Sequence, residues 1–293
     1  MQIESLKVFC DLADSGSFTK AAQINGVTQS AISQQMSMLE RTFKSQLIER
    51  SKMKLRLTPE GRVLYEYGRK VTELYRALDH QIQDLKDVIS GTIELATIYS
   101  IGLHDLPPYL KQFMATYPTV HVHVEYRSAQ KVYEDVLSNT VDVGLIAYPV
   151  KDNRLVVLPL RKEPLVLVCS PEHPFARLKT INLKALAGQK FISFEPDTPT
   201  RQALDKILQG ERVKVEHVME FDNVETVKRA VEINAGISIV PQSTVDQELE
   251  KQTLCAVEIK DGEFFRPIAA IYKKHRVLSP ALKQFLNILK GGA

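Results

Sequence analysis

The chain has 293 residues, 44% of them hydrophobic and 25% charged, and its formal net charge at pH 7 is +3. A chain of this length is expected to form two or three units with well-packed cores, and its composition excludes a disordered protein. It has no secretory leader pattern and no run of about eighteen apolar residues, so we expect no membrane contact and a cytoplasmic location. Three cysteines, far apart in sequence and without paired spacing, indicate buried thiols in a reducing compartment: Cys10, Cys169 and Cys255.

Two short helices with a polar turn between them are predicted near the N-terminus. Ser17 stands before the first helix and Thr28 before the second, and each side chain can accept an orphan backbone N–H. Asn25-Gly26 supplies the turn. A small apolar core is expected from Phe18, Ala21, Ala22, Ile24, Val27, Ile32, Met36 and Leu39. The pattern predicts a helix-turn-helix.

The second of these helices has an opposite face of short polar side chains: Thr28, Gln29, Ser30, Ser33 and Gln34. A helix that reads DNA needs such a face, because short polar side chains reach base edges in the major groove. A glutamine at the head of this helix, Gln29, can bond adenine through two hydrogen bonds, and Ser33 can reach bases or phosphates. A solvated helix in a small helical domain is the alternative interpretation.

Within residues 50–57, six residues alternate strictly between basic and apolar side chains, with Met53, Leu55 and Leu57 on one face and Lys52, Lys54 and Arg56 on the other. A strand or ribbon of this kind resembles a wing that lies along a phosphate backbone. Residues 41–70 hold nine cations and three acids, a local net charge of +6. We therefore predict DNA contacts from Ser17, Thr28, Gln29, Ser30, Ser33, Gln34, Arg50, Lys52, Lys54 and Arg56.

A long helix is predicted over residues 59–89. Thr58 is its expected N-cap, Pro59 takes the first helical position, and Gly61 mildly weakens the pattern. A heptad seam runs along it and is widened by three further residues: Leu64, Tyr67, Val71, Leu74, Leu78, Leu85 and Val88, with Tyr75, Ile82 and Ile89. A seam of this length is best buried against a partner helix, which predicts a homodimer. The alternative is a helix packed on its own chain.

From residue 90 onwards strands and helices alternate. The first series has strands at 92–98, 120–126 and 141–146, with helices at 106–116 and 130–138. The second has strands at 165–169, 190–194, 213–218 and 236–240, with helices at 199–208 and 224–234, and a strand at 268–272 and a helix at 280–289 return to the first series. This alternation of strands and helices predicts two α/β lobes, one formed by residues 90–161 with 267–293 and the other by residues 162–266. It also predicts a ligand cleft at the carboxyl ends of their strands.

Several motifs of this chain resemble the LysR family of transcriptional regulators over nearly its full length. The N-terminal ones are Ser17-Phe18, Ala21-Ala22, Gln29 to Gln35, Leu39-Glu40, Leu47, Arg50 and Leu57 to Gly61. Those further on are Leu106-Pro107, Phe113, Tyr117-Pro118, Val141 to Ile146 and Gly236 to Pro241. The sequence departs from the family pattern at Ile48, at Phe43-Lys44, where Leu-Gly is common, at Asn234 to Gly236 and at Arg127.

The resemblance implies a winged helix-turn-helix domain over residues 1–58, a dimerising linker helix over 59–89, and a two-lobed α/β effector domain like the periplasmic binding proteins over 90–293. It implies a homotetramer that activates or represses transcription according to whether a small inducer occupies the cleft. The expected partners are double-stranded DNA, that inducer, further copies of the chain and RNA polymerase.

The same resemblance places the effector contacts at the ends of the predicted strands and the starts of the helices: Ser100, Ile101, Ser128, Ile146, Thr198, Thr200, Arg201, Asn223 and Glu225. Hydroxyls, helix N–H groups and a guanidinium between Thr198 and Arg201 favour an anion, so an anionic inducer is expected. The alternative is ordinary N-capping by Thr198 with Arg201 in a surface ion pair.

No catalytic or cofactor motif stands out in the α/β region. His121 and His123 are two residues apart in a strand, which makes a weak metal site without a third ligand, so neither a metal nor a cofactor is expected. Two further interpretations stay open: a ligand-independent DNA-binding regulator whose α/β part is a structural platform, and, with less support, an α/β enzyme.

Overall fold

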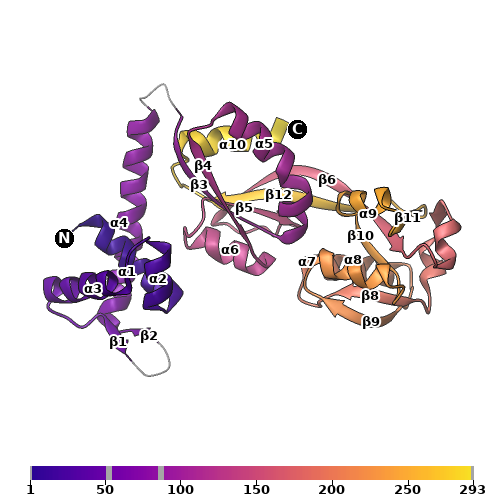
Figure 1. The fold of residues 1–293 in the computed structure, drawn as a ribbon, viewed down its shortest axis with the longest axis horizontal. Coiled ribbons are helices and arrows are strands. Elements are labelled where there is room, and N and C mark those ends of the chain that lie inside the picture. The colour runs from indigo at the N-terminus through magenta and orange to yellow at the C-terminus, as the bar shows by residue number, and fades with distance from the viewer. Residues whose placement is uncertain (1, 51–54, 85–88, 292–293) are drawn as a thin grey trace. The chain divides into compact units, whose positions relative to one another are not determined.

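The computed structural model describes residues 2–50, 55–84 and 89–291, and the chain divides into two compact units, Met1–Lys86 and Asp87–Ala293 (Figure 1). We call them the N-terminal unit and the C-terminal unit. Over the described residues, no helix is both long enough and apolar enough to cross a membrane.

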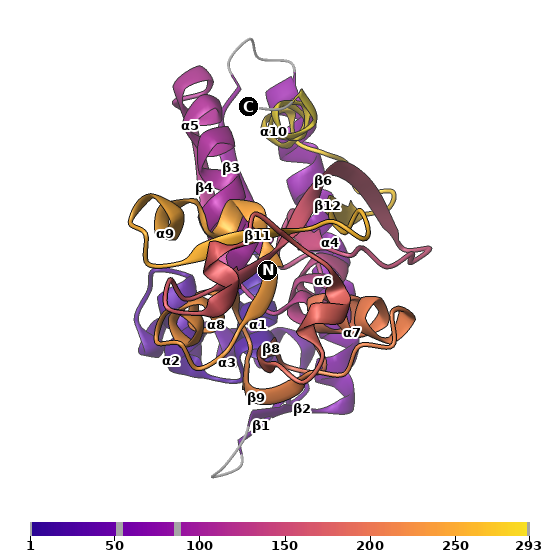
Figure 2. The ribbon, with the colours of Figure 1, turned by 90° about the vertical axis from the view of Figure 1, so that its right-hand side faces the viewer.

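The N-terminal unit contains four helices and a two-stranded hairpin among its described residues. In chain order they are α1 (Ile3–Ser15), α2 (Phe18–Ile24), α3 (Gln29–Phe43), β1 (Ile48–Arg50), β2 (Leu55–Leu57) and α4 (Pro59–Asp84). β1 and β2 pair antiparallel, with Glu49 opposite Arg56, and extend below α1–α3 in both views (Figures 1 and 2). Of the alternating segment, Arg50 ends β1 and residues 55–57 form β2. Residues 51–54, which include the predicted contacts Lys52 and Lys54, lie outside the described residues.

Side-chain caps begin the helices where the sequence predicted them. Ser17 accepts a hydrogen bond from the backbone N–H of Lys20 at 3.4 Å, and Thr28 accepts one from Ala31 at 3.2 Å. Thr58 accepts one from Gly61 at 2.9 Å, so α4 begins at Pro59. These three caps satisfy N–H groups that a helix leaves without an internal partner.

The core of the N-terminal unit differs in membership from the one that the sequence predicted. Ala21, Ala22, Ile32, Met36 and Leu39 are buried in it, together with residues of α1 and β1. The expectation that Ile24 and Val27 join them is wrong, because these side chains are 59% and 39% exposed. Ile24 ends α2 and Val27 lies in the turn before the Thr28 cap, so neither belongs to the buried stripe of a helix.

Two positions in this unit have backbone requirements that sequence pattern alone does not show. A Cβ atom at Gly61 would lie 2.0 Å from the backbone oxygen of Leu47, so this glycine is required by a close approach and does not merely weaken α4. Lys44 caps α3 in the left-handed conformation, with φ at 51°. That conformation favours glycine, and lysine adopts it at a cost.

An apolar stripe on α4 faces solvent. Its members recur every three or four residues and each is at least 39% exposed: Val63, Tyr67, Val71, Leu74, Leu78 and Ile82. Leu64, in contrast, packs against the core of the N-terminal unit. The predicted seam also included Leu85 and Val88, which lie outside the described residues, and Ile89, which instead packs on a core of the C-terminal unit.

The C-terminal unit is built on two lobes. Lobe I contains β3 (Gly91–Thr97), a π-helical turn η1 (Ile101–Asp105), α5 (Leu106–Thr116), β4 (Val120–Tyr126), α6 (Ala129–Leu137), β5 (Val143–Ala147) and α10 (Pro280–Gly291). Lobe II contains η2 (Pro174–Arg177), β7 (Thr180–Ile181), η3 (Leu183–Leu186), β8 (Lys190–Phe194), α7 (Pro199–Gly210), β9 (Glu216–Phe221), α8 (Val224–Glu232), β10 (Ser238–Pro241), η4 (Gln242–Thr244), α9 (Asp246–Glu250) and β11 (Cys255–Ile259).

Two long strands connect the lobes. β6 (Leu155–Cys169) and β12 (Phe265–Lys273) pair antiparallel at the centre of a sheet ordered β4-β3-β5-β12-β6-β11-β7, and β10 also pairs with β6. The predicted strand at 165–169 is therefore only the last third of β6. β3 pairs parallel with β4 and β5, and β8 pairs parallel with β9, so each lobe aligns the carboxyl ends of its strands.

Two of the three cysteines are neighbours in the fold. Cys169 at the end of β6 is the register partner of Cys255 on β11, although the two are far apart in sequence. Burial, with a smaller contribution from Cys255, raises the pKa of Cys169 to about 12, and burial also raises the pKa of Cys10 to about 12. Both groups are therefore neutral thiols at pH 7.

Candidate DNA-reading face and effector pocket

The first two turns of α3 present polar side chains to solvent. Thr28, Gln29, Ser30 and Gln34 are exposed and Ser33 is half-buried, while Ile32 and Met36 anchor the opposite face in the core. Within the described part of the chain, neither Gln29 nor Gln34 makes a side-chain hydrogen bond. Two amides with unused donors and acceptors on an anchored helix are available to bond base edges.

The hydroxyl groups of this face are already partly engaged. Ser17 and Thr28 both accept backbone N–H groups as caps, and the Thr28 and Ser30 hydroxyls lie 2.9 Å apart. On the hairpin, Arg56 is exposed on β2, and Arg50 ends β1. The structure thus places α3 and a basic hairpin in one unit, as a DNA-reading module requires.

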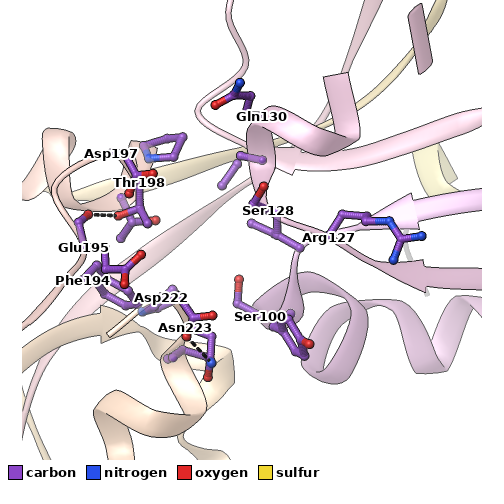
Figure 3. Close-up of a pocket in the computed structure, with 18 of the residues that line it drawn as sticks. Ser100, Arg127, Ser128, Gln130, Phe194, Glu195, Asp197, Thr198, Asp222 and Asn223 are labelled. Atoms are coloured by element: carbon purple, nitrogen blue, oxygen red, sulfur yellow. Dashed lines mark hydrogen bonds between the residues drawn. The ribbon is translucent and has the colours of Figure 1, made fainter. Parts of the chain in front are cut away.

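A cavity of about 170 Å³ lies between the two lobes (Figure 3). Lobe I lines it with residues that follow β3 and β4 and end β5, and lobe II with residues that follow β8 and β9 and end β10. Three of its lining residues are helix N-caps: Ser128 of α6, Thr198 of α7 and Asn223 of α8. The pocket therefore collects strand ends and helix starts from both lobes, the usual place for a ligand in an α/β sheet.

Five of the nine predicted effector contacts line this pocket: Ser100, Ser128, Thr198, Thr200 and Asn223. The other four do not, and their neighbours explain why. Ile101 and Ile146 are fully buried in cores of lobe I. Glu225 hydrogen-bonds His104 at 2.7 Å and pairs with Lys228 at 3.0 Å.

Arg201, on which the expectation of an anion rested, also lies outside the pocket lining. Its guanidinium pairs with Asp205 at 2.9 Å and Glu220 at 2.8 Å and donates to the backbone oxygen of Phe194 at 2.7 Å. Burial opposes its charge, but hydrogen bonds to the two carboxylates outweigh it and raise the pKa of Arg201. Its positive charge is therefore compensated by two acids and is not directed at a ligand.

Buried charges meet where the lobes join beneath the pocket. Arg266 on β12 is 1% exposed and lines the cavity; it pairs with Glu163 and donates to the Ser100 hydroxyl oxygen at 2.7 Å. Asp105 binds Arg161 and receives a hydrogen bond from Ser243 of lobe II at 3.2 Å. Burial, followed by the nearby Glu163 charge, raises the pKa of Asp105.

A second polar bridge joins the lobes at one side of the cavity. His104 of lobe I lies 2.7 Å from Glu225 of lobe II, which also contacts the buried Lys228. Burial would raise the pKa of Glu225, but hydrogen bonds from His104 and Lys228 outweigh it and lower the pKa to about 2. Glu225 is thus a charged link between the lobes at neutral pH, not a pocket-lining group.

Sequence reasoning missed several lining residues, of which the most consequential are Arg127, Glu195, Asp197, Asp222 and Arg266. Asp197 and Asp222 each stand directly before a helix N-cap and just after a strand, a position that could have indicated them. No local pattern points to Arg266, because its contact with Ser100 spans 166 residues. His123 contacts Glu94 at 2.7 Å, and in the described ranges no three metal-ligand side chains come together.

Comparisons with known proteins identify the class. A profile described as a bacterial regulatory helix-turn-helix protein of the lysR family matches residues 3–62, and one described as the LysR substrate binding domain matches residues 86–293. A probable RuBisCO transcriptional regulator of Synechocystis sp. is 31% identical over 97% of this chain and 84% of its own. The transcriptional activator CmpR of the same organism is 28% identical over 98% of this chain and 94% of its own.

Solved structures show the same fold. A full-length OxyR variant of Pseudomonas aeruginosa has a TM-score of 0.76 at 22% identity, covering 99% of this chain and 94% of that one. CbnR in complex with its target DNA has a TM-score of 0.69 at 21% identity and full coverage of both chains. A helix-turn-helix unit joined to a two-lobed α/β unit defines a ligand-controlled DNA-binding regulator. The chain belongs to the LysR family of transcriptional regulators and is not an enzyme.

Proposed function

We propose that this regulator reads its operator with the first two turns of α3, while the basic hairpin holds the phosphate backbone, and that a small effector binds between the two lobes. The observation that carries the DNA assignment is the pair of exposed amides, Gln29 and Gln34, on a helix whose other face is buried. Base-edge contacts specify sequence, whereas the hairpin cations supply affinity that does not depend on sequence.

A homodimer formed through α4 accounts for the apolar stripe on that helix. Leu74 is 70% exposed and Leu78 is 52% exposed, which is unfavourable for a helix that stays in water. Pairing of two such helices buries the stripe in the manner of a coiled coil. Two winged domains then read two half-sites about one helical turn, or a multiple of it, apart. Association of two dimers into a tetramer is part of the same proposal.

Control by the effector follows from the position of the pocket. A ligand held by residues of both lobes stabilises one arrangement of the lobes over others, and the equilibrium shifts by as much as its affinity differs between them. The effector would thereby alter the spacing of the half-sites read by the assembly, and with it the bend of the DNA and the contact with RNA polymerase. We place this activity in the cytoplasm, where the operator is.

A mobility-shift assay tests the function directly. The purified protein is mixed with its own upstream intergenic DNA and with scrambled competitor, with and without a metabolite panel, and bound complexes are footprinted with DNase. Specific retardation, with a footprint that one metabolite changes, is the expected result. A folded protein with no sequence preference would contradict the DNA assignment, and footprints identical with every bound metabolite would contradict effector control.

A further inference from the structure

The wall of the pocket that lobe II provides carries three carboxylates. Glu195, Asp197 and Asp222 are all exposed and all line the cavity. Among the described residues none of the three forms an ion pair, and Asp222 accepts a single hydrogen bond, from Asn223 at 2.7 Å (Figure 3). Asp197 and Asp222 also precede helix N-caps, where a carboxylate offsets the positive end of the helix dipole. This wall is negative, because two helix N-termini of about half a unit charge each offset only part of three carboxylate charges.

The wall that lobe I provides is different, because none of its lining residues is acidic. It offers the hydroxyls of Ser100 and Ser128 and the N-terminal end of α6, whose first turn holds no acidic residue. Ser100 accepts a hydrogen bond from Arg266, so the proton of its hydroxyl stays available to donate into the cavity. This wall is suited to an anionic group.

The two lining arginines do not make the whole pocket cationic. Arg127 pairs with Glu125 at 2.6 Å, and Figure 3 shows its side chain directed away from the cavity. Arg266 is paired with Glu163 and reaches the cavity mainly through its contact with Ser100. Since both charges are compensated, the uncompensated charges of the lining are the three carboxylates of lobe II.

One hydroxyl of a buried residue also points to a ligand. Thr200 in the first turn of α7 is 9% exposed and lines the cavity. Across the described chain its side chain has no hydrogen-bond partner, and its hydroxyl is not one of the fully buried unpaired polar atoms, so it is accessible from the cavity that it lines. A ligand group placed between the lobes would satisfy it.

We infer that the effector is a small amphoteric molecule of the aminocarboxylate class, with its carboxylate toward Ser100, Ser128 and α6 and its ammonium group toward Glu195, Asp197 and Asp222. The inference rests on the proposed function of the pocket and specifies its ligand. A cavity of about 170 Å³ is close to the volume that holds a single benzene ring, so the ligand has the size of one amino acid. Dicarboxylates and phosphates of that size are disfavoured by the wall of lobe II.

Two cysteine reporters measure the charge difference without a known ligand. Gln130→Cys places a thiol on the lobe I wall and Pro199→Cys places one on the lobe II wall, each in a Cys255→Ser background. For each variant we compare the rate at which the thiol is modified by a cationic reagent, trimethylammonioethyl methanethiosulfonate, and by an anionic reagent, sulfonatoethyl methanethiosulfonate. We expect the cation-to-anion rate ratio to be at least about fivefold higher at 199, since a unit charge near 4 Å has that effect in water. Equal ratios at the two positions overturn the charge assignment.

A matched ligand series tests the chemical class. Butyrate, 2-aminobutyrate, 4-aminobutyrate and succinate share a four-carbon chain and differ in their charged groups. Calorimetry with the full chain is expected to show at least about fivefold tighter binding of an aminobutyrate than of succinate. Asp197→Asn and Asp222→Asn should each reduce that preference, whereas Glu211→Gln, an exposed carboxylate at the far end of α7, should not.

Tighter binding of succinate than of both aminobutyrates overturns the inference, as does a preference that persists in both aspartate variants. Neither result touches the proposed function, because operator binding and a metabolite-dependent footprint are measured separately. Loss of the specific footprint itself would instead count against the proposed function and leave the charge difference between the walls standing.

Discussion

The two units place their polar groups in opposite ways. In the N-terminal unit the predicted reading residues, such as Gln29, face solvent above an apolar core. In the C-terminal unit charged groups such as Arg266, Glu163 and Asp105 are buried beneath the pocket and bind one another. Substitutions on the reading face should therefore change DNA binding with little effect on folding, whereas substitutions under the pocket should change ligand response and stability together.

The strongest test of this contrast is Arg266→Met. Removing Arg266 leaves the buried Glu163 without its compensating charge, while Asp105 keeps its pair with Arg161, so we expect the free energy of unfolding to fall by about 3–5 kcal/mol. Urea unfolding followed by circular dichroism measures it. Arg154→Ala is the matched control, because Arg154 pairs with Asp152 on the surface, and its midpoint should not move. If Arg266→Met left the free energy of unfolding as little changed as Arg154→Ala does, the buried ion pairs would not be a stabilising element.

Gly61→Ala tests the close approach in the other unit. The new Cβ would meet the backbone oxygen of Leu47 at 2.0 Å, and a backbone atom cannot turn aside as a side chain does. We expect a loss of about 3 kcal/mol in the N-terminal unit, with weaker DNA retardation and an unchanged ligand response. Gly210→Ala, where a Cβ meets nothing within 4 Å, serves as the control. Normal stability of Gly61→Ala would mean that β1 and α4 are not held this closely.

Acid should weaken the His104–Glu225 bridge between the lobes. The pKa of Glu225 is lowered from 4.5 to about 2 in the folded chain, so its stabilising contribution is complete above pH 4.5 and is lost as the pH falls toward 2. Unfolding midpoints of the wild type and Glu225→Gln should therefore differ at pH 7 and converge as the pH approaches 2. If the difference in unfolding midpoint between the two proteins stayed constant from pH 7 to pH 2, the charge of Glu225 would not be the source of the stabilisation.

The smallest expected effect is a gain. Lys44→Gly removes a side chain from a left-handed position at the end of α3 and should raise the stability of the N-terminal unit by about 1 kcal/mol. Lys44→Ala, which keeps a Cβ and removes the same charge, should give no such gain. If the glycine and alanine variants had equal unfolding midpoints, the left-handed backbone at position 44 would not be the source of the gain.

Local chemistry explains what could be predicted from the sequence. The caps Ser17, Thr28, Thr58 and Thr198 were visible because an N-cap acts on residues two or three positions away. The five predicted residues that line the pocket lie at strand ends or helix starts, which the alternating pattern located to within a few residues.

Contacts between segments that are distant in sequence could not be predicted from local patterns. The need for Gly61 arises from the backbone of Leu47, the pairing of Arg201 on α7 involves Glu220 on β9, and Arg266 meets Ser100 across 166 residues. Periodicity describes one element at a time, so it predicted a strand at 268–272 but neither its extension to Arg266 nor the contact that this residue makes. The same limit explains why a free anion-binding role was expected of Arg201.

The roles of α3 and the hairpin are tested most directly by comparing the DNA affinities of Gln29→Ala and Arg56→Ala. Each variant is titrated with operator and with scrambled DNA over a range of salt concentrations. We expect Gln29→Ala to lose about 1–3 kcal/mol of discrimination between the two sequences, with its affinity for scrambled DNA retained. Arg56→Ala should weaken binding to both sequences alike and reduce the salt slope by about 1. Unchanged base preference in Gln29→Ala would contradict the assignment of α3 as the reading helix.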